Sequence, residues 1–295
     1  MLNKVEPLLK KLNTKTQNLK YLYEEFRIYD FGSYALNRLT PKKGYSVREN
    51  VAYGLAARHR LDLYQTTFPR DHRPLIVFVH GGAWLHGDKK DYRFVGEAFA
   101  KEGFDVAVIN YTLAPQHIFP AYVDDLTLAL NYLDAHQSKL NISTQRVVLL
   151  GHSAGAFNVM SAIYHPQKYE ITCRANIKAV VGLAGPYHFD YKDDPLCADA
   201  FDQEEPYQNV MPSYFVESNH IQHYLFIAEN DKIVHLSNAT NFDEKLKEFG
   251  NHSEMVVIPK TGHVTLMGSV SSLFSRLYST KKEIMRVLDQ ALTEV

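Results

Sequence analysis

Short apolar runs alternate along this chain with longer stretches of helical periodicity. The run at residues 75–79 is apolar throughout, which is typical of a strand buried on both faces of a sheet. The same kind of pattern predicts five further strands, at residues 105–111, 146–150, 179–184, 224–228 and 255–258. Upstream, residues 49–54 and 59–65 are expected to form an antiparallel pair of strands across a short turn.

Helical periodicity fills the intervals between these strands. Pro120 is followed by Val123, Leu126, Leu130 and Leu133, which fall on one face of a helix. Other helices are expected at residues 92–102, directly after residue 153, at 237–249 and at 269–292. Strands that alternate with helices predict an α/β fold with a mostly parallel sheet covered on both faces.

Two segments depart from this alternation. Residues 1–45 carry leucines at helical spacing followed by a dense aromatic run, so we expect a helical arm that packs on the body as part of a cap. Residues 46–295 are then expected to form a single domain. Within it, the stretch 186–220 is long, acidic and aromatic, which predicts a small lid or a pocket wall.

Composition narrows the classes of partner. The net charge of -1 over 295 residues gives no electrostatic reason to expect nucleic acid or an anionic membrane. Residues 1–20 contain no apolar stretch of the kind found in signal peptides or membrane spans. Cys173 and Cys197 are too few for a disulfide framework and lack zinc-binding spacing, although they could form one bridge. We therefore expect a cytoplasmic protein without a metal.

The pentapeptide Gly151-His152-Ser153-Ala154-Gly155 lies between a predicted strand and a predicted helix. In a turn this sharp the two glycines are a steric requirement, and the serine hydroxyl is held out where a substrate can reach it. Ser153 is therefore the candidate nucleophile.

A serine hydroxyl needs a base to take its proton and an acid to orient that base. Asp231 and His263 each follow a predicted strand, so both belong at the same edge of the sheet as Ser153. An aspartate in this position is more often a turn former, but with His263 and the serine turn the catalytic interpretation is favoured. Asp243 and Glu229 are poorer candidates for the acid.

The sequence His80-Gly81-Gly82-Ala83-Trp84 follows the buried strand at 75–79. Acyl transfer places negative charge on the former carbonyl oxygen, and backbone N–H donors must await that charge. The expected donors are the amides of Gly82 and Ala83, with Gly81 as an alternative, together with that of Ala154 behind the nucleophile.

These motifs, with Asn110-Tyr111-Thr112-Leu113-Ala114-Pro115 and Phe119-Pro120-Ala121, resemble the esterase/lipase branch of the α/β-hydrolase superfamily. Similar proteins include hormone-sensitive-lipase-like carboxylesterases, isoprenylcysteine-methylesterase-like proteins and kynurenine formamidases. The resemblance covers about residues 47–292. It implies the α/β-hydrolase fold with an eight-stranded sheet and an acyl-enzyme mechanism without a cofactor. The chain order Ser153, Asp231, His263 is the order of the triad in that superfamily.

The sequence thus predicts a serine hydrolase that cleaves carboxylic esters of small to medium acyl groups. Its substrate pocket is expected to include Trp84, Tyr187, Phe189 and Phe215, although these aromatics could equally belong to the core. One alternative is an arylformamidase, since formamidases also have a tryptophan at the position of Trp84. The other is a non-catalytic binding protein on the same fold.

Overall fold

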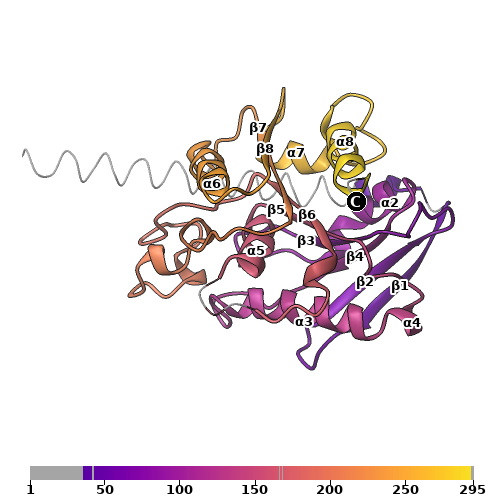
Figure 1. The fold of residues 1–295 in the computed structure, drawn as a ribbon, viewed down its shortest axis with the longest axis horizontal. Coiled ribbons are helices and arrows are strands. Elements are labelled where there is room, and N and C mark those ends of the chain that lie inside the picture. The colour runs from indigo at the N-terminus through magenta and orange to yellow at the C-terminus, as the bar shows by residue number, and fades with distance from the viewer. Residues whose placement is uncertain (1–35, 42, 166, 168, 294–295) are drawn as a thin grey trace, which may run out of the picture.

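The computed structural model describes residues 36–41, 43–165, 167 and 169–293, which contain an eight-stranded sheet (Figure 1). The strands lie in the order β1-β2-β4-β3-β5-β6-β7-β8. β2 is antiparallel to both of its neighbours, and every other pair is parallel. The mostly parallel, eight-stranded sheet expected from the sequence is therefore confirmed. The strands are β1 Tyr45–Ala52, β2 Arg60–Thr66, β3 Leu75–Val79, β4 Asp105–Ile109, β5 Val147–His152, β6 Ile177–Leu183, β7 Gln222–Ala228 and β8 Ser253–Ile258.

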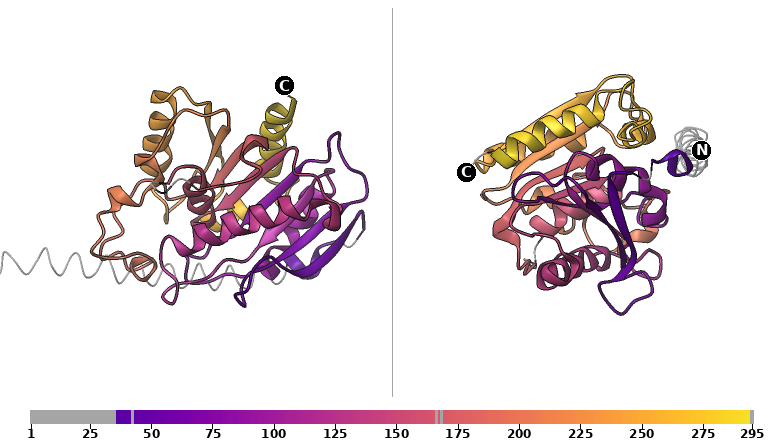
Figure 2. Two further views of the ribbon diagram at one scale, coloured as in Figure 1. Left: turned by 60° about the horizontal axis from the view of Figure 1, so that its bottom comes forward. Right: turned by 90° about the vertical axis from the view of Figure 1, so that its right-hand side faces the viewer.

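Helices cover both faces of this sheet, as the two turned views show (Figure 2). α3, α5 and α6 supply buried side chains to the core on one face, and α2, α7 and α8 supply them on the other. Figure 1 shows α6 and α8 on opposite sides of β7 and β8. The helices are α2 Arg93–Ala100, α3 Ala121–Ala135, α4 Gln137–Leu140, α5 Ala154–Ile163, α6 Ser237–Glu248, α7 His263–Gly268 and α8 Thr280–Thr293.

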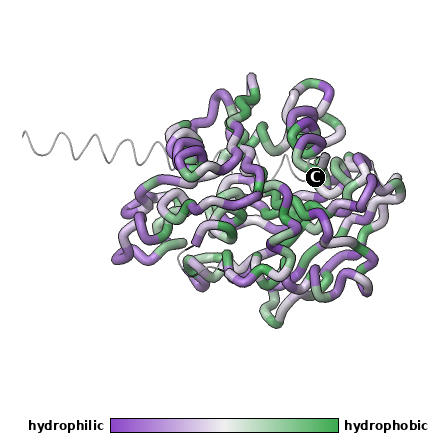
Figure 3. The backbone as a smooth tube through the Cα atoms, viewed as in Figure 1, coloured by the Kyte–Doolittle hydropathy of each residue, from purple (hydrophilic) through white to green (hydrophobic). Residues whose placement is uncertain are grey.

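β3 is apolar throughout because it contributes side chains to two cores. In β3, Leu75, Val77 and Val79 pack into the core beneath α3 and α5, whereas Ile76 and Phe78 pack into the core beneath α2 and α8. Side chains alternate between the two faces of a strand, so helices on both sides bury every position of β3. The hydrophobic colouring is accordingly concentrated along the central strands (Figure 3).

One helix prediction was correct only in its C-terminal half. The sequence suggested a single helix over residues 269–292, but α7 ends at Gly268 and α8 begins at Thr280. The intervening stretch is rich in serine, whose hydroxyl competes with helical hydrogen bonding. Ser269 Oγ donates to the carbonyl of Leu266 and also lies 2.6 Å from Thr280 Oγ1. These bonds turn the chain between the two helices.

The predicted arm at residues 1–45 lies almost entirely outside the described residues. The segment 186–220 lies within them and forms turns and three short 3-10 helices, η3 Ala198–Ala200, η4 Tyr207–Asn209 and η5 Pro212–Tyr214. Its aromatics pack into the body, where Tyr191 and Phe201 stack with ring centroids 4.4 Å apart. Within the described residues, every helix is too short or too polar to cross a bilayer.

The strand order brings two turns of the chain together at one edge of the sheet. β3 lies between β4 and β5, and its last residue, Val79, is in register with Gly151 of β5. The chain thus leaves β3 toward one neighbour and returns on the other side. In parallel sheets, ligands bind in the crevice that such a reversal opens at the carboxyl ends of the strands.

Candidate active site

Ser153 sits at the top of a strained turn between β5 and α5. Its backbone has φ 53° and ψ −122°, a combination that residues with a side chain rarely adopt. Its N–H donates to the carbonyl of Leu183 in β6 at 2.8 Å, which holds the turn against the next strand. A side chain on Gly151 would place its Cβ 2.3 Å from the carbonyl oxygen of Gly155. The turn therefore closes only because residue 151 is glycine.

Gly155 is equally constrained, and this gives a test of the turn. A Cβ at this position would lie 2.1 Å from the carbonyl oxygen of Val79, so Gly155→Ala must push α5 away from β3. We expect destabilisation by about 3 kcal/mol or more, which lowers the melting temperature by roughly 6–12 °C. Gly268→Ala is the control, since its nearest neighbour would be Leu36 Cδ1 at 3.8 Å. Equal melting of Gly155→Ala and wild type would contradict this seating of α5.

Asp231 and His263 come from neighbouring strand ends and meet directly. Asp231 follows β7, His263 opens α7 just beyond β8, and His263 Nδ1 lies 2.9 Å from Asp231 Oδ2. The other carboxylate oxygen of Asp231 accepts from the amides of Ile233 and Val234. Burial alone would raise the pKa of Asp231, but His263 and these two amides together lower it. The acid is therefore held ionised against the ring.

His152 connects this pair to the serine turn. Its Nε2 lies 3.1 Å from the carbonyl oxygen of His263, and the two rings are 5.1 Å apart. Burial lowers the pKa of His152 to about 3, so the ring is neutral and donates its Nε2 proton to that carbonyl. His263 is therefore fixed beside the residue that precedes Ser153.

The two acids judged poorer from the sequence have other partners. Glu229 accepts from the amide of Lys260 at 2.7 Å, which ties the loop after β7 to the loop after β8. Asp243 lies in α6 and is bound by Lys247 and by the hydroxyl of Ser253. Neither carboxylate has a recorded bond to His263.

The loop after β3 reaches the serine turn. A Cβ on Gly81 would lie 3.0 Å from Ser153 Cβ, so the loop backbone passes directly beside the serine. Gly82, Ala83 and Trp84 follow with φ values of 126°, 50° and 59°, three consecutive residues in the left-handed region. A side chain on Gly82 would meet the carbonyl oxygen of His86 at 2.2 Å, so this position also requires glycine.

Buried side chains hold this loop from behind. His80 Nδ1 lies 2.8 Å from the carbonyl oxygen of Gly81, and Tyr111 donates its hydroxyl to the carbonyl of His80. Burial lowers the pKa of His80 to about 4, so the ring remains neutral at neutral pH. The His80 ring stacks on Tyr111 with centroids 4.5 Å apart.

The backbone amides around the serine lack protein partners. Among the described residues, no acceptor is recorded for the N–H groups of Gly82, Ala83 or Ala154. Ala154 is the first residue of α5, and the exposed N–H groups at a helix N-terminus favour negative charge. These amides are thus available to a developing oxyanion.

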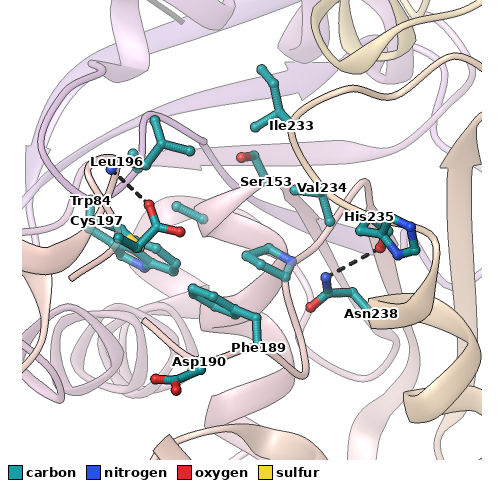
Figure 4. A pocket seen from close by; sticks show the side chains of 14 residues that line it. Trp84, Ser153, Phe189, Asp190, Leu196, Cys197, Ile233, Val234, His235 and Asn238 are labelled. Atoms are coloured by element: carbon teal, nitrogen blue, oxygen red, sulfur yellow. Dashed lines mark hydrogen bonds between the residues drawn. The ribbon is translucent and has the colours of Figure 1, made fainter. Parts of the chain in front are cut away.

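A pocket of about 230 Å³ opens at Ser153 (Figure 4). Ser153 lies between Trp84 and Leu196 on one side and His235 and Asn238 on the other. The segment 186–220 supplies six of the fourteen lining residues, and the loop that follows Asp231 supplies three more. The lining residues not named above are Ala83, Ala154, Pro186, Phe189, Asp190, Asp194, Cys197, Ile233 and Val234.

The four aromatics predicted for the pocket are divided by the structure. Trp84 and Phe189 line it. Tyr187 is fully buried and stacks on Phe242 with centroids 4.9 Å apart, and Phe215 packs on the core, so neither is among the lining residues. A residue that follows a strand can turn toward the core as readily as toward the pocket.

Several lining residues had no place in the sequence prediction. Ile233 and Val234 lie two and three residues after Asp231, so their proximity to the site was open to inference. Asp190 and Asp194 belong to the acidic segment whose position was predicted but whose individual contacts were not. Cys197 is a buried free thiol. Its pKa is raised mainly by burial and further by the nearby Asp194. Over the described part of the chain, no cluster of three or more His, Cys, Asp or Glu could hold a metal ion.

Comparison with curated proteins finds esterases and a formamidase. The chain is 25% identical over 244 residues to a probable isoprenylcysteine alpha-carbonyl methylesterase of Arabidopsis thaliana, covering 75% of this chain and 51% of that protein. It is 24% identical over 243 residues to esterase LipC of Mycobacterium tuberculosis, covering 74% and 60%. It is 28% identical over 149 residues to kynurenine formamidase of Drosophila melanogaster, covering 50% and 48%. The chain spans about half the length of the curated relatives it matches.

Solved structures share the fold of this chain, and a family model matches most of its length. Esterase B from Lactobacillus rhamnosis matches with a TM-score of 0.76 at 17% identity, covering 95% of each chain. An esterase of Thermogutta terrifontis matches with a TM-score of 0.65 at 20% identity, covering 86% of this chain and 94% of that one. The model of the BD-FAE family matches residues 61–246, well over half of the chain. The chain therefore belongs to the BD-FAE family, within the esterase/lipase branch of the α/β-hydrolase superfamily.

Proposed function

We propose that this protein is a carboxylic ester hydrolase that works through an acyl-enzyme on Ser153. The observation that carries the proposal is the strained turn that presents Ser153 to a pocket, beside the amides of Gly82 and Ala83, which have no acceptor among the described residues. The bond between His263 and Asp231 supports it, because an oriented imidazole is the base that a serine requires. The esterases among the relatives point to the same reaction class.

The reaction follows from these roles. His263 accepts the proton of the Ser153 hydroxyl as its oxygen attacks the carbonyl carbon of the ester, and Asp231 stabilises the resulting imidazolium. The oxyanion receives hydrogen bonds from the amides of Ala154 and of Gly82 and Ala83, with Gly81 as an alternative donor. His263 then protonates the leaving alcohol, and the acyl group remains on Ser153. A water that gives its proton to His263 attacks the acyl-enzyme, and His263 returns that proton to the Ser153 oxygen as the acid leaves.

The pocket favours esters of small to medium acyl groups. Its volume of about 230 Å³ is modest, and Trp84, Phe189 and Leu196 give it an apolar wall. We assign the segment 186–220 as the pocket wall, because six of its residues line the space in front of Ser153. Two buried free thiols, Cys173 and Cys197, fit a reducing compartment such as the cytoplasm.

An arylformamidase is the second candidate, favoured by the Drosophila melanogaster relative and by Trp84. It would use the same nucleophile on an N-formyl amide. The deciding experiment compares kcat/KM for 4-nitrophenyl esters of graded chain length with kcat/KM for formanilide. We expect acetate to hexanoate esters to be cleaved fastest, long-chain esters slowly, and formanilide more slowly than the short esters. Faster cleavage of formanilide would replace the ester proposal with the formamidase.

A non-catalytic binding protein on this fold is the third functional hypothesis. It predicts no turnover of any of these substrates and no reaction of Ser153 with a fluorophosphonate. Two features argue against it, because a binding surface needs neither. These are the amides near Ser153 that have no acceptor in the described part of the chain, and the hydrogen bond that orients the His263 ring.

A further inference from the structure

Asn158 is an unusual residue for its position in α5. The helix is otherwise made of small and apolar residues apart from Ser161, and Asn158 is completely buried. Its Nδ2 has no recorded partner among the described residues. A buried amide group left unsatisfied costs about 1–3 kcal/mol, whereas a leucine, which has the same branching and no polar atom, would not carry that cost. Packing alone therefore does not account for asparagine here.

Among the described residues, the one hydrogen bond of the Asn158 side chain is to Trp84 in the loop after β3. Trp84 donates its indole N–H to Asn158 Oδ1 at 2.9 Å. An indole nitrogen can only donate, so this bond also fixes which end of the asparagine amide faces Trp84. The indole is 2% exposed and is enclosed by the rings of Tyr122, Phe157 and Phe201. The rings confine the indole plane, and the hydrogen bond to Asn158 fixes its position along α5.

The loop needs such a tie because its backbone is strained. Ala83 and Trp84 both have positive φ, and residues held in such conformations cost on the order of 1 kcal/mol each. They persist only where the surroundings hold them. The backbone of Trp84 accepts from the amide of Ala114, and its side chain is anchored to Asn158, so the residue is held at both ends.

The two halves of the oxyanion hole lie on different elements. Gly82 and Ala83 belong to the loop after β3, whereas Ala154 belongs to α5. Asn158 lies four residues after Ala154, which places it one turn further along the same face of the helix. Because a hydrogen bond runs from Trp84 to Asn158, the loop is tied to the helix that carries the opposite donor.

We propose that Asn158 is a positioning residue of the oxyanion hole, which sets the separation of its two halves through the indole of Trp84. This inference rests on the proposed ester hydrolysis at Ser153. Oxyanion donors act only when they lie at hydrogen-bond distance from the oxygen of the transition state, and a shift of about 1 Å can cost a hundredfold in rate. Asn158 thus acts on the reaction without touching the substrate.

The test breaks the bond from either side. Asn158→Leu removes the acceptor, and Trp84→Phe removes the donor while it keeps a ring in the pocket wall. We expect each variant to lower kcat for 4-nitrophenyl butyrate by about tenfold to a hundredfold, with KM changed by less than about threefold. The affinity for an alkyl trifluoromethyl ketone, whose adduct places an oxyanion in the hole, should fall by a similar factor. The kcat of the double variant should be no lower than that of the less active single variant, since both substitutions remove the same bond.

Ser161→Ala is the matched control. Ser161 lies three residues further along α5, is equally buried, and has a hydroxyl without a recorded partner. Its loss should leave kcat, KM and inhibitor affinity unchanged. If Asn158→Leu does not fold, Trp84→Phe still tests the bond, because Asn158 is then intact.

Three results would overturn the role of Asn158. These are unchanged kcat in a folded variant, additive losses in the double variant, and a rise in KM without a fall in kcat, which would make Trp84 a pocket wall only. A wild-type protein inert to both the ester and a fluorophosphonate would instead overturn the proposed function, and this inference with it.

Discussion

Replacement of Ser153 by alanine is expected to lower kcat for short-chain esters by about six orders of magnitude, as far as the assay can follow it. The variant lacks the oxygen that attacks the carbonyl, while the amides of the loop after β3 and of α5 remain. Alanine keeps the Cβ atom, so the backbone strain at φ 53° and the packing of the turn are retained. Steady-state turnover should therefore collapse while the melting temperature stays close to that of wild type.

Two measurements make this result interpretable. Circular dichroism and thermal melting establish that Ser153→Ala is folded, and an active-site titration of wild type establishes the fraction of competent protein. Turnover within tenfold of wild type in a folded variant would remove Ser153 from the chemistry.

Replacement of Asp231 by asparagine is expected to lower kcat by about ten-thousandfold, with a small effect on KM. In the native structure Asp231 Oδ2 accepts a hydrogen bond from His263 Nδ1. Its Oδ1 accepts hydrogen bonds from the amides of Ile233 and Val234. An asparagine has only one oxygen for these two tasks. If its oxygen stays with the two amides, its NH₂ group faces His263 and favours the tautomer that carries the proton on Nε2. That ring cannot take the proton of Ser153.

Asp243→Asn is the control for this variant. Asp243 is also a buried acid, and it is bound by Lys247 of α6 and by Ser253 of β8 rather than by a histidine. Its replacement should lower the melting temperature and leave kcat per folded protein close to wild type. A large loss of kcat in Asp243→Asn with none in Asp231→Asn would reverse the assignment of the acid.

The fold was accessible from the sequence where burial dictates the pattern. β3 was predicted with its observed bounds, because all five of its residues are apolar and both of its faces are covered. The helix after Pro120 was predicted for the same reason, since one apolar face must meet the sheet. The helix expected at 269–292 begins only at Thr280, because serine side chains, rather than the apolar pattern, decide where the chain turns after Gly268.

The candidate site was likewise predictable from the sequence only in part. Residues at the ends of parallel strands can be inferred to share one edge, and this reasoning led to Ser153, Asp231 and His263 as candidates. The direction of a side chain in a long loop is not set by any period, so Tyr187 and Phe215 could not be separated from Phe189. Asn158 had one available signal, a carboxamide in an apolar helix, but its partner Trp84 lies 74 positions away in sequence.

Covalent labelling tests the central claim most directly. Folded wild-type protein is treated with a fluorophosphonate, digested, and analysed by mass spectrometry for the modified peptide. The account predicts a single adduct on Ser153, none at that position in Ser153→Ala, and much slower labelling of Asp231→Asn. Ester hydrolysis by wild-type protein that leaves Ser153 unmodified, or that is lost on modification of another residue, would contradict it.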